Sequence, residues 1–335
     1  MMYPKLWLGS VCVVASLAAA HAVDAKEPGK PIRAGIIGVD TSHAVAFATL
    51  LQDPKAPKEL ARMKIVAAYP VGSPDIPASQ EKVGEYTEKL RSMGVEIVGS
   101  TKELLKRVDA VLVESVDGRP HLAQARAAIL AGKPVFVDKP MAASLADAMQ
   151  IFRLAKEKHV PCFSSSSLRF SKGFQAVRNG KAGYGPVCGC IAWSPMHTEP
   201  HHPDFFWYGI HGVETLFTIM GPGCQTVIRT GPESAVGVWK DGRVGTFLAD
   251  NGRYGALVKG AKKSGDAGGF DGYAPLVVQI VKFFQTGRPP VSAEETLEIM
   301  AFMEAADQSK QQGGAPVSIE NVVKKAEEQI AAGKP

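Results

Sequence analysis

The strongest constraint on the fold is an alternation, between residues 31 and 165, of short apolar runs with amphipathic stretches of helical length. The apolar runs predict buried strands at 33–39, 63–68, 96–100, 110–114, 134–137 and 161–165. The stretches between them predict helices at 42–51, 80–93, 102–107, 122–131 and 144–158. Strands that alternate with helices favour βαβ units, and right-handed crossovers then give a doubly wound parallel sheet. A ligand site is expected at the carboxyl ends of these strands.

The second half of the chain consists of strand-like segments that are separated by turn residues. These segments lie at 187–194, 225–230, 234–240, 243–249 and 256–260. Asp241 and Gly242 predict a hairpin turn, and helical patterns follow at 276–284 and 293–310. We predict a doubly wound domain at 31–165 and an α+β domain with an open, mainly antiparallel sheet at 166–330. The closing helices are placed so that they can pack back on the first domain.

Residues 1–25 have the pattern of a Sec-type signal peptide. Lys5 precedes an apolar run at 6–20, and small residues around Ala20 and Ala25 offer cleavage sites. The pattern predicts export to the periplasm or the cell exterior, with an uncleaved anchor as the alternative. No later segment reaches the roughly 18 apolar residues of a membrane span, so we expect no stable span after cleavage.

Composition limits the chemistry and the partners of the exported chain. An oxidising compartment would permit disulfides among Cys162, Cys188, Cys190 and Cys224, and the sequence leaves their pairing open, free thiols included. The net charge is +5, and the basic residues are scattered rather than gathered in an arm or a stripe. A nucleic-acid partner is therefore not expected.

Several motifs stand in an order that is typical of one enzyme family. The segment 35–38 reads GIIG, a histidine at position 121 follows the fourth predicted strand, and the segment 131–140 reads AGKPVFVDKP. The segment 209–214 reads GIHGVE, and a predicted closing helix follows Pro289. Over residues 31–320 this order resembles the glucose–fructose oxidoreductase and inositol dehydrogenase (Gfo/Idh/MocA) family. The resemblance implies that the first domain is Rossmann-like.

The resemblance further implies an NAD- or NADP-dependent oxidoreductase that takes a hydride from a sugar or polyol, in a chain that can form homo-oligomers. It assigns proton transfer to Lys139 and His211, which match the family's catalytic positions. A lysine near a cationic nicotinamide ring has a destabilised charge, so it can exchange protons near neutral pH. The expected dinucleotide contacts are Gly38, Asp40, Thr41, Ser42, His43, Ser115, His121 and Asp138.

The dinucleotide fingerprint of this chain departs from G-x-G-x-x-G. Asp40 and His43 replace the second and third glycines, although Gly38 is kept. A carboxylate at this turn is expected to repel the pyrophosphate that a helix N-terminus otherwise attracts. The second predicted strand ends at Tyr69, where NAD enzymes usually have an acidic residue for the ribose. Trp207 stands where the family has a catalytic aspartate.

The polar residues of the second half allow a different kind of site. Arg169, His202, Tyr208 and Glu214 are the predicted substrate contacts. The candidate ligands of a divalent metal are His197, His201, His202 and His211. Three functions therefore stay open: an NAD(P)-dependent oxidoreductase, a non-redox and possibly metal-assisted carbohydrate lyase, epimerase or hydrolase, and a sugar-binding protein that has lost the dinucleotide. Either enzyme requires the ammonium group of Lys139 and the imidazole of His211 to converge across a cleft.

Overall fold

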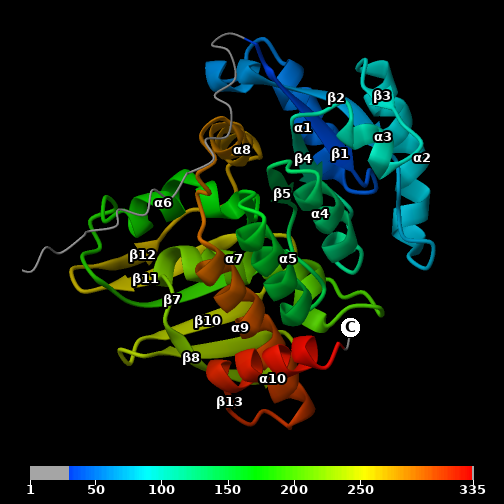
Figure 1. Cartoon of the computed structure of the whole chain (residues 1–335). Coiled ribbons are helices and arrows are strands. Elements are labelled where there is room, and N and C mark those ends of the chain that lie inside the picture. The colour runs from blue at the N-terminus through cyan, green and yellow to red at the C-terminus, as the bar shows by residue number, and fades with distance from the viewer. Residues whose placement is uncertain (1–29, 334–335) are drawn as a thin grey trace, which may run out of the picture. The chain divides into compact units, whose positions relative to one another are not determined.

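The computed structural model describes residues 30–333, and the residues from Pro31 onward form one compact unit (Figure 1). The predicted signal peptide, residues 1–25, lies outside the described residues. Two sheets organise the compact unit, one in each half of the sequence. Because they belong to a single compact unit, the boundary between residues 165 and 166 stays a prediction.

The first sheet has six parallel strands in the order β3-β2-β1-β4-β5-β6. The strands are β1 (Ile32–Ile37), β2 (Met63–Tyr69), β3 (Glu96–Ile97), β4 (Ala110–Val113), β5 (Val135–Val137) and β6 (Cys162–Ser164). The helices between them are α1 (Ser42–Gln52), α2 (Pro77–Ser92), α3 (Thr101–Leu105), α4 (His121–Leu130) and α5 (Leu145–Glu157). This strand order is that of the Rossmann fold, so the predicted doubly wound sheet is confirmed.

Local sequence explains where these helices begin. Thr41 caps α1 by accepting a hydrogen bond from the backbone N–H of His43, and Ser144 caps α5 by accepting one from Asp147. The central strands are apolar on both faces, since every residue of β4 and β5 is buried. The loops that leave the carboxyl ends of β1, β4 and β5 therefore meet along one edge of the sheet.

The second sheet has seven strands in the order β12-β11-β7-β10-β9-β8-β13. They are β7 (Val187–Ser194), β8 (Cys224–Gly231), β9 (Ser234–Trp239), β10 (Val244–Ala249), β11 (Gly255–Gly260), β12 (Ser264–Asp266) and β13 (Val317–Ser318). The sheet is mainly antiparallel, as predicted, but β7 and β10 pair in parallel at its centre. The short strands β12 and β13 were not predicted.

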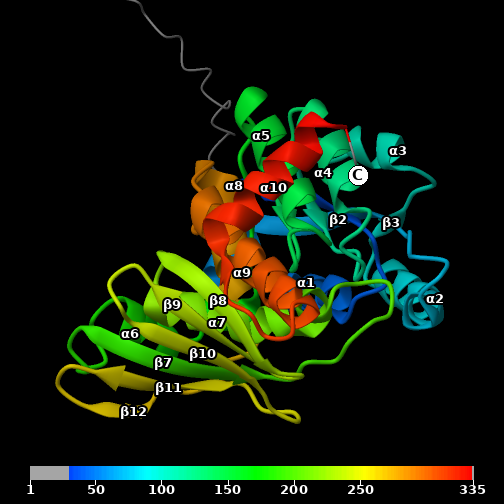
Figure 2. The ribbon, with the colours of Figure 1, turned by 90° about the horizontal axis from the view of Figure 1, so that it is seen from below.

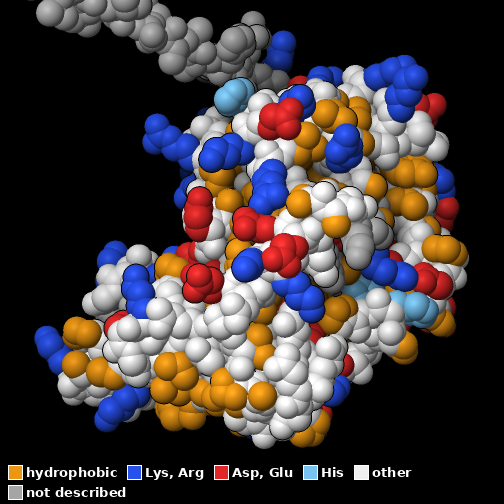
Figure 3. Space-filling model, turned by 60° about the horizontal axis from the view of Figure 1, so that its bottom comes forward, with side chains coloured by type: hydrophobic (Ala, Val, Ile, Leu, Met, Phe, Trp, Pro, Cys, Tyr) orange, Lys and Arg blue, Asp and Glu red, His pale blue; other side chains and the backbone are white. Residues whose placement is uncertain are grey.

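The helices of the second half are α6 (Lys172–Arg178), α7 (Ile210–Met220), α8 (Ala274–Thr286), α9 (Ala293–Gln311) and α10 (Ile319–Ala331). Of these, α7, α9 and α10 contact the second sheet. Every residue of α7 is buried, and a Cβ at Gly212 would clash with Phe247 of β10, which shows how closely α7 lies against the sheet. The opposite face is open and exposes Ile191, Val244, Leu248 and Leu257 (Figures 2 and 3).

Some of the closing helices pack on the first half of the chain. Leu276 and Ile280 of α8 share a core with Ile36 and Phe47, and α9 and α10 both contact α5. No helix within residues 30–333 combines the length and apolar character of a membrane span. The four cysteines of the described chain are free thiols, and of these Cys188 is exposed.

Candidate active site

A cavity of about 200 Å³ lies at the carboxyl edge of the first sheet. Its polar lining comes from the β1–α1 turn, at 40–43, and from Lys139, which follows β5. The second half contributes His211 and an aromatic wall. That wall contains Tyr208, Tyr254, Phe270 and Tyr273. A larger hollow of about 700 Å³ lies between α1 and β2 and holds none of the predicted site residues.

Lys139 and His211 come from different halves of the chain and face this one cavity, as an enzyme would require. The Lys139 Nζ lies 5.7 Å from the centre of the Tyr208 ring, and the His211 ring centre lies 5.1 Å from that same ring. Lys139 has no ion-pair partner among the described residues. The two residues are 72 positions apart in the sequence, so the tertiary fold brings them to the same cavity.

The imidazole of His211 is held as a neutral group. Burial lowers its pKa well below the ordinary value, and the positive charge of Lys139 adds to this effect. The Nδ1 atom lies 2.8 Å from the Ser166 Oγ, which also accepts a hydrogen bond from the N–H of Leu168. With the Nδ1 proton donated to this hydroxyl oxygen, the lone pair of the neutral ring sits on Nε2. A neutral ring with one free nitrogen can exchange a proton with a substrate.

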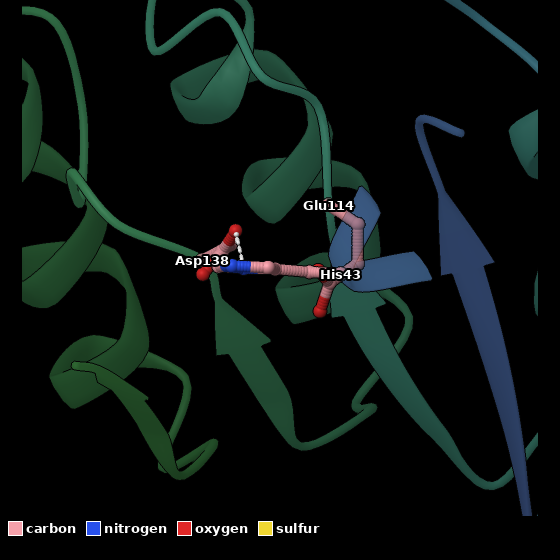
Figure 4. A group of neighbouring side chains, drawn as sticks. All are labelled: His43, Glu114 and Asp138. Atoms are coloured by element: carbon pink, nitrogen blue, oxygen red, sulfur yellow. Dashed lines mark hydrogen bonds and ion pairs between the residues drawn. The ribbon is translucent and has the colours of Figure 1, made fainter. Parts of the chain in front are cut away.

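A second group of titratable side chains, shown in Figure 4, adjoins the cavity through His43. His43, in the first turn of α1, places its Nδ1 2.7 Å from the Asp138 Oδ2. Glu114, which directly follows β4, is fully buried, and neither of its carboxylate oxygens has a hydrogen-bond partner within residues 30–333. Burial and the neighbouring Asp138 raise the pKa of Glu114 well above its usual value. Burial opposes ionisation of Asp138, but His43 and Lys139 outweigh it and lower the pKa of Asp138.

These three residues contain the ligand types that a metal ion prefers, and their ligand atoms lie within 4.8 Å of one another. A neutral Glu114, an ionised Asp138 and the ammonium group of Lys139 already balance the charge at this place. The charges of these residues are therefore balanced without a metal ion.

The metal site predicted in the second half is not formed. His201 lies 2.7 Å from Glu199, His202 lies 2.9 Å from Asp117, and the His197 ring meets the Tyr208 ring edge-on. Among residues 30–333, the group that could hold a metal contains none of His197, His201, His202 and His211. The candidate ligands do not converge, because the loop directs each of its histidines to a different neighbour.

Three of the predicted substrate contacts lie inside the protein. The guanidinium of Arg169 is only 2% exposed and pairs with Glu214 of α7 and, at 2.9 Å, with Glu295 of α9. These ion pairs tie the loop after β6 to two helices, so they replace the predicted role of Arg169 and Glu214 in binding substrate. His202 is likewise buried, against Asp117 and the Trp207 ring, and does not reach the cavity. Tyr208 does line it.

Some of the predicted cofactor contacts line the cavity, and others are buried away from it. Asp40, Thr41, Ser42 and His43 line the cavity, whereas His121 is buried and its ring joins two loops. The His121 Nε2 lies 2.9 Å from the carbonyl oxygen of Ser115, and its Nδ1 lies 3.0 Å from that of Pro140. His121 is thus a link between the β4–α4 and β5–α5 loops rather than a ligand contact. The Ser115 hydroxyl bonds to Gln124.

The β1–α1 turn keeps the shape of a dinucleotide-binding turn at its start. Gly38 has φ +85°, and a Cβ there would clash with Ser115, so glycine is required. Farther along, the Asp40 carboxylate accepts hydrogen bonds from the Val116 N–H at 2.9 Å and from the Ser79 hydroxyl at 2.7 Å. Asp40 therefore bridges the turn to the β4–α4 loop and to α2. Burial raises the pKa of this carboxyl group.

A second bridge crosses the same region. The Ser73 hydroxyl donates to Asp117 at 2.5 Å and joins the β2–α2 loop to the β4–α4 loop. The adenosine and pyrophosphate of a dinucleotide normally run between these loops. Two carboxylate bridges stand there instead, so the residues at the phosphate end do not fit a dinucleotide in this arrangement. At the other end, Lys139 and the cavity have room for a small ligand.

Sequence reasoning missed several residues of this site. Glu114 reads as the last residue of an apolar strand, Tyr254 lies in the loop between β10 and β11, and Tyr273 directly precedes α8. Burial raises the pKa of Tyr254, so its hydroxyl stays protonated and can donate a hydrogen bond. No pattern of spacing connects these residues, because only the tertiary fold brings their loops to the cavity.

Comparison with known proteins agrees with this architecture. Residues 32–166 match the model of an oxidoreductase family described as having an NAD-binding Rossmann fold. The oxidoreductase YhhX of Escherichia coli (strain K12) is 29% identical over 119 residues, which are 30% of this chain and 32% of YhhX. An inositol 2-dehydrogenase of Cereibacter sphaeroides is 48% identical over 58 residues, or 17% of each chain. The chain thus matches a third or less of the length of these two relatives.

Solved structures extend the likeness to both halves of the chain. The myo-inositol 2-dehydrogenase of Lactobacillus plantarum has a TM-score of 0.70 at 16% identity, covering 86% of this chain and 99% of its own. The scyllo-inositol dehydrogenase of Lactobacillus casei, with bound NAD(H) and scyllo-inositol, has a TM-score of 0.68 at 14% identity, covering 87% and 100%. At such identities the structures establish the common fold, while the sequence match covers the first half. The sequence match thus identifies residues 32–166 as similar to the Gfo/Idh/MocA family of oxidoreductases, and the solved structures show that both halves of the chain share the fold of these proteins.

Proposed function

We propose that this chain is an enzyme that acts on a small sugar or polyol, with Lys139 and His211 as its proton-transfer pair. The observation that supports this most directly is the cavity of about 200 Å³ that both side chains line. A cavity of that size suits one small polar molecule, since sites for larger ligands usually occupy about 300–1,000 Å³. The scyllo-inositol bound to the Lactobacillus casei enzyme supports a polyol as the substrate class.

Lys139 and His211 have different roles because the first is charged and the second is neutral. The ammonium group of Lys139 can hold a substrate oxygen and stabilise negative charge that develops on it. The neutral His211 can take the proton of a hydroxyl group or return one to it, because its free nitrogen faces the same cavity. The hydroxyl groups of Tyr208 and Tyr254 are placed to orient the other oxygens of a polyol.

The family's own chemistry is hydride transfer to NAD or NADP, and the match to an NAD-binding family supports it as one candidate. A bound nicotinamide would supply the hydride acceptor. The bridge from Asp40 to Ser79 and Val116 does not fit the pyrophosphate, so this candidate requires the bridge to open. We draw no step through the dinucleotide for that reason.

The second candidate is a non-redox reaction of a sugar or polyol, such as epimerisation or elimination. The closed phosphate end of the site favours it, because such a reaction needs only proton transfers. A sugar-binding protein without turnover would use the same cavity, and only an activity measurement separates it from an enzyme.

The test uses purified protein with myo-inositol and scyllo-inositol as probes. We expect either polyol to bind, as measured by calorimetry, and we expect Lys139→Met to weaken or abolish turnover. Nicotinamide absorbance after addition of NAD⁺ or NADP⁺ distinguishes the redox candidate, since a non-redox enzyme leaves it unchanged. Binding of neither probe, together with an absence of turnover for a wider sugar panel, would refute the proposal.

A further inference from the structure

We propose that His43, oriented by Asp138, is a catalytic base that removes a proton from a carbon next to a carbonyl group, with Lys139 holding the carbonyl oxygen. This inference rests on the proposed function, since it uses the same cavity. It adds an activity that requires no dinucleotide, and it gives a role to a residue that stands where the fingerprint has its third glycine.

The position of His43 supports this assignment first. The residue lies in the first turn of α1, and Thr41 fixes its backbone by accepting a hydrogen bond from the His43 N–H at 3.3 Å. Its side chain is only 7% exposed and lines the cavity that also contains Lys139. A base and a cation therefore face one small volume, which is the arrangement that proton abstraction next to a carbonyl requires.

The orientation of the ring is fixed on three sides. Phe47 stacks on it with 5.3 Å between ring centres, and Tyr273 meets it edge-on at 4.8 Å. On the third side the Nδ1 atom lies 2.7 Å from the Asp138 Oδ2. A carboxylate that accepts the Nδ1 proton leaves the lone pair on Nε2, as in other His–Asp pairs. The Nε2 atom has no hydrogen-bond partner among residues 30–333, so it is free for a substrate.

The group behind the ring suits a base that gains and loses a proton. Asp138 is 1% exposed, its Oδ1 has no hydrogen-bond partner in the described part of the chain, and His43 and Lys139 lower its pKa. Glu114 lies beside it with a raised pKa and stays neutral. A single buried negative charge therefore stabilises the imidazolium that forms when His43 takes a proton.

The reaction balances without an oxidant. The bond between the carbon and its hydrogen breaks, and the proton passes to the His43 Nε2. The electron pair of that bond becomes the C=C bond of an enediolate, while the carbonyl electron pair moves to oxygen beside the Lys139 ammonium group. Return of a proton to the carbon restores the ketone. In D₂O the returned atom is deuterium, because the imidazolium exchanges with solvent.

The experiment uses 2-keto-myo-inositol, the ketone of a cyclic polyol, with dinucleotide-free protein in D₂O. Proton NMR measures loss of the signals next to the carbonyl. We expect the wild-type protein to exchange them well above the buffer rate, and His43→Asn to lower the enzymatic rate by about 100-fold or more. Asp138→Asn should lower it as well, since the tautomer of His43 is no longer fixed.

The matched control is His159→Asn. His159 is an exposed histidine after α5 with φ +55°, a conformation that asparagine tolerates, so the exchange rate should be unchanged. Thermal unfolding and saturation-transfer NMR with the ketone show that each variant is folded and binds the probe.

The outcomes separate this inference from the proposed function. Exchange that survives in a folded His43→Asn protein overturns the assignment of the base. Binding of the ketone by the wild-type protein without any exchange also overturns it, but leaves the proposed function intact. No binding of the ketone or of either inositol overturns both.

Discussion

Removal of the charge on Asp40 tests why the phosphate end of the site does not fit a dinucleotide. Asp40→Asn keeps an oxygen that can accept from the Val116 N–H and an amide that can bond to Ser79, and it removes only the charge. Two unit charges about 5 Å apart repel by about 3 kcal/mol at an effective dielectric constant of 20. Salt lowers this value, so we expect Asp40→Asn to bind NAD⁺ about 10- to 100-fold more tightly than the wild-type protein.

Asp40→Gly removes the hydrogen bonds as well as the charge. We expect it to bind NAD⁺ at least as tightly as Asp40→Asn, at a cost in stability of about 1–3 kcal/mol for the two lost bonds. Asparagine should cost less than about 1 kcal/mol, because both bonds can be kept. The comparison of the two variants therefore separates the effect of the Asp40 charge on NAD⁺ affinity from the effects of the side-chain volume and of the hydrogen bonds that hold the loop.

The assay is a calorimetric titration with NAD⁺ at pH 8 and low salt, with Asp53→Asn as the control at an exposed carboxylate beyond α1. Burial raises the pKa of Asp40, so a fall in pH neutralises the wild-type carboxyl group earlier than an ordinary aspartate. The difference in affinity between wild type and Asp40→Asn should therefore shrink between pH 8 and pH 5. Equal affinities at pH 8 in two folded proteins would show that the carboxylate does not exclude the phosphate.

Three further predictions concern turnover and stability. Lys139→Ala should abolish turnover and cost about 1–3 kcal/mol in unfolding free energy, since the ammonium group offsets the buried charge of Asp138; retained activity would remove its catalytic assignment. Arg169→Met leaves the buried carboxylates of Glu214 and Glu295 without this partner and should cost about 3–5 kcal/mol in denaturant unfolding, whereas a loss below 1 kcal/mol would contradict a structural ion pair. Burial raises the pKa of Asp307 to about 7, so the folded state holds this proton more tightly than the unfolded state, and stability falls as pH rises from about 4 to 7. Asp307→Asn should therefore raise Tm at pH 8 more than at pH 5, and an equal shift at both values would count against the raised pKa.

The first sheet could be predicted from the sequence because its strands are continuous apolar runs. Residues 110–113 and 135–137 are apolar throughout and form the fully buried strands β4 and β5. The second sheet offered only short alternating segments, and their pairing depends on contacts across the sequence. The parallel pairing of β7 with β10 joins strands that are separated by two other strands and a helix, so no local pattern indicates it.

The sequence predicts site residues correctly where they belong to a recognisable sequence motif. Lys139 and His211 stand in such motifs, and both reach the cavity. Arg169 was assigned to the substrate because its role depends on Glu295, which lies 126 residues farther along the chain. A charged side chain has the same appearance in a sequence whether it faces a ligand or a buried counter-charge. Only its burial, and the position of its partner, distinguish the two cases.

The two replaced glycines of the fingerprint have separable consequences. Asp40 bonds to α2 and to the β4–α4 loop, whereas His43 bonds to Asp138 after β5, so the two side chains act on different parts of the site. Asp40→Asn should change dinucleotide affinity and leave the exchange of 2-keto-myo-inositol unaltered, because it does not touch the ring of His43. His43→Asn should do the reverse. If either variant changed both measurements to the same extent, the turn would be acting as one structural unit, and neither side chain could be given a chemical role of its own.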